Sequence, residues 1–347
     1  MSDQPIIELP AAERRRRFLS FKRLQRATIL VLLVALCVFA SVRTPRFFSW
    51  TNIVDSLFTN AAALGVIAVG MTFVMVAGGF DLSVASNTAV CSVVLILSLD
   101  ALSPYGPAVA IPISLLLTAA AGTALGTFNG MLVAYVGVNP FVVTLSTMLI
   151  FRGLALILTG GGQSFQVADL ALRDQFSWIY DAKFPIFGGD YQVSMPIVIF
   201  VTVFIIGVYV LRFTRFGHYA YAIGGNEEAA RLAGVNTHRI KAATYMMLGF
   251  TCAVAATIFV AMTATAQAES HQGKELDVIA SVIVGGTPLG GGSGGLFATL
   301  IGLLLLQVIN NLLTQFNVGD KYRPVVTGLI ILIVVTVDVL AKRRMRK

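Results

Sequence analysis

Few side chains in this chain of 347 residues have the type and spacing that chemistry requires. The three histidines, His218, His238 and His271, are scattered, so none belongs to an HExxH zinc motif, and no GxSxG sequence supplies a serine nucleophile. The three cysteines lie in apolar stretches and lack the paired spacing of a metal site or a disulfide framework. We therefore predict no catalytic residue and no metal site, and hence no enzyme.

The glycine tract at 290–295 is not a phosphate-binding loop. Such a loop ends in Lys followed by Ser or Thr, whose side chains contact the phosphates and Mg²⁺, and this pair is missing here. Together with Gly285, Gly286 and Pro288, the tract instead predicts a flexible break between two helices. Any nucleotide chemistry coupled to this chain must therefore take place on another chain.

Charged side chains inside the apolar runs are few: Arg152 and Asp338, with Asp55 and Asp81 near the ends of runs. They form no cluster of the kind with which an ion-coupled carrier titrates a proton or coordinates Na⁺. Asp81 is expected to cap a helix N-terminus, with a direct role in transport as the alternative. Arg152 is expected either to snorkel to the outer interface or to contact the substrate or a neighbouring helix.

The elements that carry these residues are those of a membrane protein. Hydrophobic residues make up 56% of the chain and charged residues 12%, against about 45–50% and about 25% in soluble proteins. The mean hydropathy is +0.82. The net charge of +8 is concentrated at the two ends and in one central loop rather than on a folded basic face, which argues against a nucleic-acid partner.

Apolar runs near the length that crosses a bilayer, about 20 residues, occur along most of the chain. We expect about ten helices, covering 27–42, 53–77, 84–101, 108–136, 139–158, 193–211, 242–266, 276–287, 293–315 and 322–341. The run at 276–287 is too short to cross alone, so we expect it to belong to a broken or extended helix. The predicted fold class is all-α and integral to the membrane, in contact with lipid.

The distribution of basic residues predicts the orientation. The segments 1–26, 212–241 and 342–347 contain 17 of the 25 Lys and Arg residues, and cytoplasmic loops carry the positive excess. We therefore divide the chain into a basic cytoplasmic tail (1–26), a transmembrane domain (27–341) and a basic cytoplasmic end (342–347), with both termini inside. The segment 159–192 lies outside and is either a docking surface or a plain interfacial helix.

A weak internal repeat relates the two halves of the chain. The sequence Asp81-Leu-Ser-Val-Ala-Ser86 resembles Asp277-Val-Ile-Ala-Ser281, and in both halves an asparagine and a proline-initiated helix follow. In the predicted topology the two aspartates face opposite sides of the membrane, so the halves would be inverted repeats. Chance similarity between short motifs of small residues is the alternative.

The helix predicted at 108–136 has a small residue at every fourth position, including Gly122, Gly126 and Gly130. Little hydrophobic force acts between helices in lipid, so close backbone approach across small residues supplies the packing energy. We expect a tightly packed contact along this stripe. It lies either in the interior of the bundle or at a subunit interface.

The central basic loop, 212–241, contains a short helix with well-placed ends. Asn226 is a suitable N-cap, Glu227 and Glu228 place negative charge in the first turn, and Gly234 ends the helix. So short a helix has little stability alone and needs a surface to bind. We expect its two alanines to form a small exposed face for that contact. The residues that we expect to couple this chain to a partner are Asn226, Glu227, Glu228, Ala229, Ala230, Arg231 and Gly234.

From about residue 45 to 341 the sequence resembles the permease subunits of bacterial ABC importers for ribose, xylose, galactose and related sugars. The motifs that carry the resemblance are Gly78-Gly79-Phe80-Asp81-Leu82-Ser83-Val84, Asn129-Gly130, Asn139-Pro140-Phe141-Val142-Val143-Thr144-Leu145, Phe151-Arg152-Gly153, Gly224-Gly225-Asn226 and Glu228-Ala229-Ala230-x-x-x-Gly234. Glu-Ala-Ala-x-x-x-Gly alone is a weak signal, whereas the set together is specific.

The resemblance implies a vitamin-B12-importer-like permease of about ten helices in the bacterial inner membrane, paired with a second copy as a homodimer. The short helix would bind a groove of a cytoplasmic ATPase that carries ATP and Mg²⁺, and a periplasmic binding protein would deliver the sugar. The residues assigned on this basis to the translocation pathway are Asp81, Asn129, Asn139, Phe141, Thr144 and Arg152. A branched-chain amino-acid permease, an ion-coupled carrier and a membrane-embedded enzyme are the alternatives.

Overall fold

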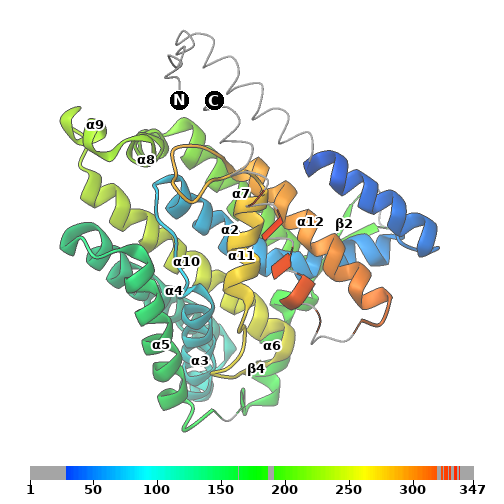
Figure 1. Cartoon of the computed structure of the whole chain (residues 1–347). Coiled ribbons are helices and arrows are strands. Elements are labelled where there is room, and N and C mark those ends of the chain that lie inside the picture. Colours follow the sequence, from blue (N-terminus) through cyan, green and yellow to red (C-terminus); the bar gives the residue numbers. More distant parts are fainter. Residues whose placement is uncertain are drawn as a thin grey trace.

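The computed structural model describes residues 29–162, 164–186 and 191–318, together with positions 322, 324–326, 328, 329, 332, 333 and 336. Within this part of the chain the protein is a bundle of helices (Figure 1). The fold class is thus all-α, as predicted. The terminal segments 1–26 and 342–347 and most of the predicted helix at 322–341 lie outside the described residues.

Seven helices in the described residues are long and apolar enough to cross a membrane. They are Thr51–Val76, Val84–Tyr105, Pro107–Val136, Pro140–Leu158, Met195–Phe213, Thr237–Thr263 and Leu296–Gln315. Each matches one of the predicted runs to within five residues at either end. A shorter apolar helix, Ile29–Arg43, matches the first predicted run.

Three of these spans begin with a proline in the first turn: Pro107, Pro140 and Pro196. Proline lacks the N–H that would be unpaired there and its φ suits a helix, so it fixes where a span starts. The helices are η1 (Thr51–Phe58), α2 (Thr59–Val76), α3 (Val84–Leu102), η2 (Ser103–Tyr105), α4 (Pro107–Met131), η3 (Leu132–Val136), α5 (Pro140–Leu158), α6 (Leu170–Asp181), α7 (Met195–Phe213), α8 (Arg215–Gly225), α9 (Glu227–Leu232), α10 (Thr237–Thr263), α11 (Lys274–Val284) and α12 (Leu296–Gln315).

Helix α2 is the centre of the main core. Nearly all of its residues are buried, and α7, α10, α11 and α12 pack around it. The 11-residue α11 is too short to cross a membrane and ends in the Gly285-Gly286 break, as predicted for 276–287. A second core is formed by residues of α3, α5 and α6 together with the end of α10.

Helices α8 and α9 lie at one end of the bundle, and α6 and β4 lie at the other (Figure 1). Strand β1 (Phe165–Gln166) pairs antiparallel with β4 (Thr265–Ala266), and β2 (Lys183–Ile186) pairs with β3 (Tyr191–Ser194). These two-residue and four-residue pairs were not predicted, because segments this short have no measurable periodicity. They tie the segment after α5 to the end of α10 and join α6 to α7.

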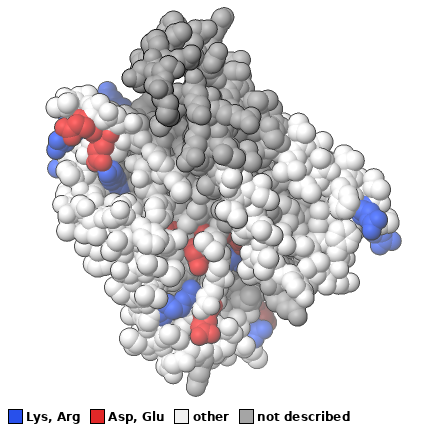
Figure 2. All heavy atoms as spheres, in the orientation of Figure 1, with Lys and Arg blue, Asp and Glu red and all other residues white. Residues whose placement is uncertain are grey.

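The surface seen in Figure 2 is mostly uncharged, with charged side chains around α9, at one edge and in a small central group. Large apolar side chains such as Leu116, Leu149 and Ile157 are exposed on the sides of the bundle. Such a surface suits lipid rather than water, in agreement with the predicted membrane class.

Candidate functional site

The central basic loop folds into two helices rather than one. Asn226 caps α9, because its side-chain Oδ1 accepts a hydrogen bond from the backbone N–H of Ala229 at 2.9 Å. Gly234 follows in the left-handed region with φ of 83° and ends the helix. These caps are as predicted. Helix α8 was not predicted, since its alternating Tyr and Ala residues and its glycines resemble a loop.

The charges of α9 are exposed and mutually paired. Arg231 donates to both carboxylate oxygens of Glu228 at 2.7 Å, and this hydrogen bond raises the pKa of Arg231. Lys241 pairs with Glu227 at 2.5 Å and thereby connects α9 to α10. Leu232, the last residue of this helix, is 80% exposed.

The prediction that Ala229 and Ala230 form one exposed face is wrong. Ala230 is 6% exposed and faces the bundle, whereas Ala229 is exposed. Neighbouring residues on a helix point about 100° apart, so a single face cannot present both. Ala229, Leu232 and the acidic first turn therefore make the free surface of α9.

Asp81 lies in a buried polar network and is not the N-cap of α3, which is Ser83. Its Oδ1 accepts hydrogen bonds from the Ser83 backbone N–H at 2.7 Å and the Ser83 hydroxyl at 2.6 Å. Asn129 of α4 donates to Asp81 Oδ2 at 3.1 Å. Tyr245 of α10 donates to the Phe80 carbonyl at 3.1 Å. Two predicted pathway residues, 48 positions apart, thus meet and fasten the α2–α3 turn to α4 and α10.

The network contains an unpaired acceptor. Asn129 is fully buried, and its Oδ1 has no hydrogen-bond partner among the described residues. None of the ion pairs found in the described part of the chain involves Asp81. An unpaired buried charge is costly, so the three hydrogen-bond donors to the Asp81 carboxylate are what makes its burial tolerable.

The glycine stripe of α4 packs against α10 of the same chain. A methyl group added at Gly126 would lie 2.4 Å from the Tyr245 carbonyl oxygen, and one at Gly122 would lie 2.5 Å from that of Gly249. At Gly130 the distance to a backbone oxygen of α10 would be 2.8 Å. We call this contact the glycine seam. The stripe therefore packs inside the bundle and not between subunits.

The predicted residues of α5 lie near its start. Asn139 caps the helix by accepting from the Phe141 N–H at 2.9 Å, and Thr144 is buried and donates to the Pro140 carbonyl at 2.8 Å. Phe141 is 49% exposed, with its ring centroid 6.3 Å from that of Phe80. Asn139 and Phe141 are exposed and Thr144 is buried; a pathway role for all three stays a prediction.

Arg152 lies twelve residues further along α5, about 18 Å from Pro140. It does not snorkel freely, because its guanidinium donates to the carbonyl oxygens of Ala268 and Ser270 (2.9 Å for Ser270) in the segment between α10 and α11. Glu275, whose charge acts on Arg152, keeps a buried oxygen without a partner among the described residues. Burial, and then the charges of a neighbouring lysine and Arg152, lower the pKa of His271 to about 4, so that it is neutral at pH 7.

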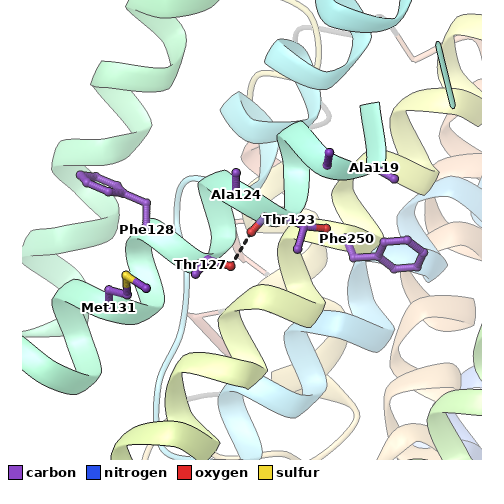
Figure 3. A pocket seen from close by; sticks show the side chains of 8 residues that line it. Ala119, Thr123, Ala124, Thr127, Phe128, Met131 and Phe250 are labelled. Atoms are coloured by element: carbon purple, nitrogen blue, oxygen red, sulfur yellow. Dashed lines mark hydrogen bonds between the residues drawn. The ribbon is translucent and has the colours of Figure 1, made fainter. Parts of the chain in front are cut away.

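An apolar hollow of about 650 Å³ lies along an exposed face of α4, beside Phe250 of α10 (Figure 3). Its lining consists of Ala119, Ala120, Thr123, Ala124, Thr127, Phe128, Met131 and Phe250. The Thr127 hydroxyl donates to the Thr123 carbonyl at 2.7 Å, so it is satisfied within its own helix. None of the predicted pathway residues lines this hollow.

Sequence reasoning missed Ser83 and Tyr245, which complete the network of Asp81. A serine and a tyrosine in apolar surroundings are common packing residues, so their types gave no signal. It also missed that Gly224 and the tract at 290–295 contact the end of α2. The signal was present, since a run of glycines often marks a close approach of two backbones.

A comparison with protein families decides the class of the chain. The profile of the family described as "branched-chain amino acid transport system / permease component" matches residues 53–335. The chain belongs to this permease family. Its match begins within η1 and continues beyond α12, so it covers all but the first two residues of the seven candidate membrane helices.

Similar proteins extend the match to nearly the full length. The ribose import permease protein of Escherichia coli (strain K12) is 36% identical over 93% of this chain and 96% of its own length. That of Bacillus subtilis (strain 168) is 36% identical over 88% of this chain and 90% of its own length. A xylose transport system permease protein of Haemophilus influenzae is 28% identical over 93% and 98%. No solved structure matches the chain.

These relatives are permease proteins of transport systems. The chain is therefore an ABC importer permease and a transport subunit, not an enzyme, as predicted from its lack of catalytic motifs. The seven apolar helices agree with a protein that crosses the membrane many times.

Proposed function

We propose that the chain is the non-catalytic permease subunit of an ATP-driven importer and forms the translocation pathway for a monosaccharide or a related polyol. The observation that carries the proposal is 36% identity to a ribose import permease over 93% of the chain. Identity spread over that length includes the helices that must line the pathway. The family description mentions branched-chain amino acids, but the ribose and xylose permeases match over nearly their full length, which favours a sugar.

The proposal includes the architecture of the assembly. About ten helices would form two inverted half-repeats of a vitamin-B12-importer-like fold, with both termini in the cytoplasm. Two copies would pair as a homodimer with the pathway between them. The seven candidate spans and the Ile29–Arg43 helix support this number, and the short α11 would supply a helix that enters the membrane without crossing it.

The chain would receive its driving force from partners. ATP and Mg²⁺ would bind to a cytoplasmic ATPase that docks on α9, whose capped N-terminus and exposed Leu232 provide the contact. A periplasmic binding protein would dock at the opposite end, where α6 exposes Trp178. Asp81, Asn129, Asn139, Phe141, Thr144 and Arg152 stay our assignment for the pathway.

Uptake by a reconstituted complex tests the proposal. The permease, its ATPase and its binding protein are placed in vesicles, and uptake of labelled ribose, xylose, galactose and leucine is followed with and without ATP. We expect one of the sugars to accumulate only with ATP and only when the ATPase is present. Accumulation of leucine alone, or of any solute by the permease without its ATPase, would contradict the proposal.

A further inference from the structure

Three glycine-containing segments meet at the α8 end of the bundle. They are residues 76–79 at the end of α2, the end of α8 at Gly224, and residues 291–295 between α11 and α12; we call them the glycine junction. The Gly292 N–H donates to the Val76 carbonyl at 2.9 Å, which joins the loop to the most buried helix of the protein.

The junction is a contact between backbones. A methyl group added at Gly224 would lie 2.0 Å from the Val76 oxygen and 2.4 Å from the Gly292 nitrogen. One added at Gly291 would lie 2.6 Å from the Gly78 nitrogen. Side chains can absorb a displacement by changing rotamer, whereas packed backbones cannot. A movement of the end of α8 must therefore move the end of α2 and the 291–295 loop with it.

A side chain adds a second link between the same segments. Tyr221 of α8 donates to the Gly294 carbonyl at 3.0 Å. Beyond the junction, Tyr245 holds the Phe80 carbonyl and Asn129 holds Asp81, so the α2–α3 turn is fastened in turn to α4 and α10. A continuous set of contacts thus runs from α8 to the helices on both sides of α2.

Helix α9 provides the input. Only Asn226 separates it from Gly225, the last residue of α8, so a force on α9 reaches α8 through the chain itself. Building on the proposed function, we propose that Gly224, Gly292 and Tyr221 are positioning residues that carry the movement of α9, driven by the ATPase, into the α2–α3 turn and the 291–295 loop. They do this by direct backbone contact, without touching the sugar.

Adjacent glycines supply a matched test. Gly224→Ala introduces a clash at the junction, whereas a methyl group at Gly225 would meet no atom within 4 Å. Hydrogen exchange of the complete complex with its ATPase is measured with and without ATP. In the wild type and in Gly225→Ala we expect ATP to change exchange in α8, at 76–83 and at 288–295. In Gly224→Ala we expect the change to be confined to α8 and α9.

A milder pair keeps the test decisive if Gly224→Ala does not fold. Tyr221→Phe removes one hydroxyl without changing the ring, and Tyr219→Phe makes the same change on an exposed side of α8. We expect Tyr221→Phe to reduce the sugar transported per ATP hydrolysed about threefold or more, at unchanged ATPase binding, with Tyr219→Phe equal to the wild type.

The outcomes separate this inference from the proposed function. Failure of the wild type to accumulate any sugar would contradict the proposed function, yet the exchange measurement would still report whether the movement is transmitted. No ATP-dependent change at 76–83 and 288–295 in the wild type would overturn the inference. So would identical exchange in Gly224→Ala and the wild type, or, where Gly224→Ala does not fold, unchanged coupling in Tyr221→Phe.

Discussion

In the glycine seam a methyl group added at Gly126 would lie 2.4 Å from a backbone oxygen of α10, whereas one at Gly234, beyond α9, would meet no atom within 4 Å. Position 126 requires glycine because the α10 backbone leaves no room for a side chain, whereas position 234 favours glycine only because its φ is 83°. The seam fixes two membrane helices relative to each other. The end of α9 is held by few contacts and leaves its surface free for a partner, so the two regions should respond differently to substitution.

The largest effect is expected in the seam. Gly126→Leu should lower the free energy of unfolding by about 3 kcal/mol, because α4 and α10 must separate to admit the side chain. Thermal unfolding in detergent, followed by size-exclusion chromatography, measures it. Gly153→Leu on α5, where an added methyl group meets nothing within 4 Å, is the control. Equal melting of the two variants would show that the seam is looser than described.

The next effect concerns the buried network. Asp81→Ala leaves the Ser83 backbone N–H and hydroxyl without their acceptor, while the Asn129 amide keeps only its hydrogen bond to the Ser83 hydroxyl oxygen at 2.8 Å; each unpaired buried group costs about 1–3 kcal/mol. We expect a loss of about 2 kcal/mol in the same melting experiment. Asp174→Ala, at an exposed position on α6, should have no effect. A stability unchanged by Asp81→Ala would mean that the network relaxes around water.

Changes on α9 should affect association and not stability. Glu228→Lys places a positive charge beside Arg231 and cancels the net negative charge of the first turn, where Glu227 remains; we expect it to weaken ATPase binding about tenfold at unchanged melting temperature. Asp174→Lys makes the same charge change at the opposite end of the bundle. Weakened binding in both variants would indicate a general electrostatic effect rather than a contact at α9.

The smallest effect should come from the cap of α9. Asn226→Ala removes the hydrogen bond to the Ala229 N–H and should destabilise this short helix by about 1 kcal/mol, with Asn226→Ser restoring it. Amide exchange within α9 is the measurement. Equal exchange in the alanine and serine variants would show that the ion pair of Glu227 with Lys241 holds the helix instead.

The sequence predicted the features that depend on residues close together in the chain, and missed those that depend on distant residues. The membrane helices and the caps of α9 were predicted because apolar runs and Asn or Gly at helix ends act locally. The glycine stripe predicted close packing, but not whether the contact was internal. The meeting of Asp81 with Asn129, and that of Gly224 with Val76, depend on residues far apart in the chain. Without an account of how the helices pack, no spacing rule brings them together.

The central claim is that driving force enters through α9, and cross-linking tests it most directly. Cys37 is first replaced by serine, and the native Cys91 and Cys252 are buried. In this background either Leu232→Cys on α9 or Trp178→Cys on α6 is introduced, and membranes that contain the complex are treated with a cysteine-reactive cross-linker. We predict that Leu232→Cys cross-links to the ATPase and that Trp178→Cys does not, but reacts from the outer side. Cross-linking of the ATPase to Trp178→Cys, or only external labelling of Leu232→Cys, would contradict the account.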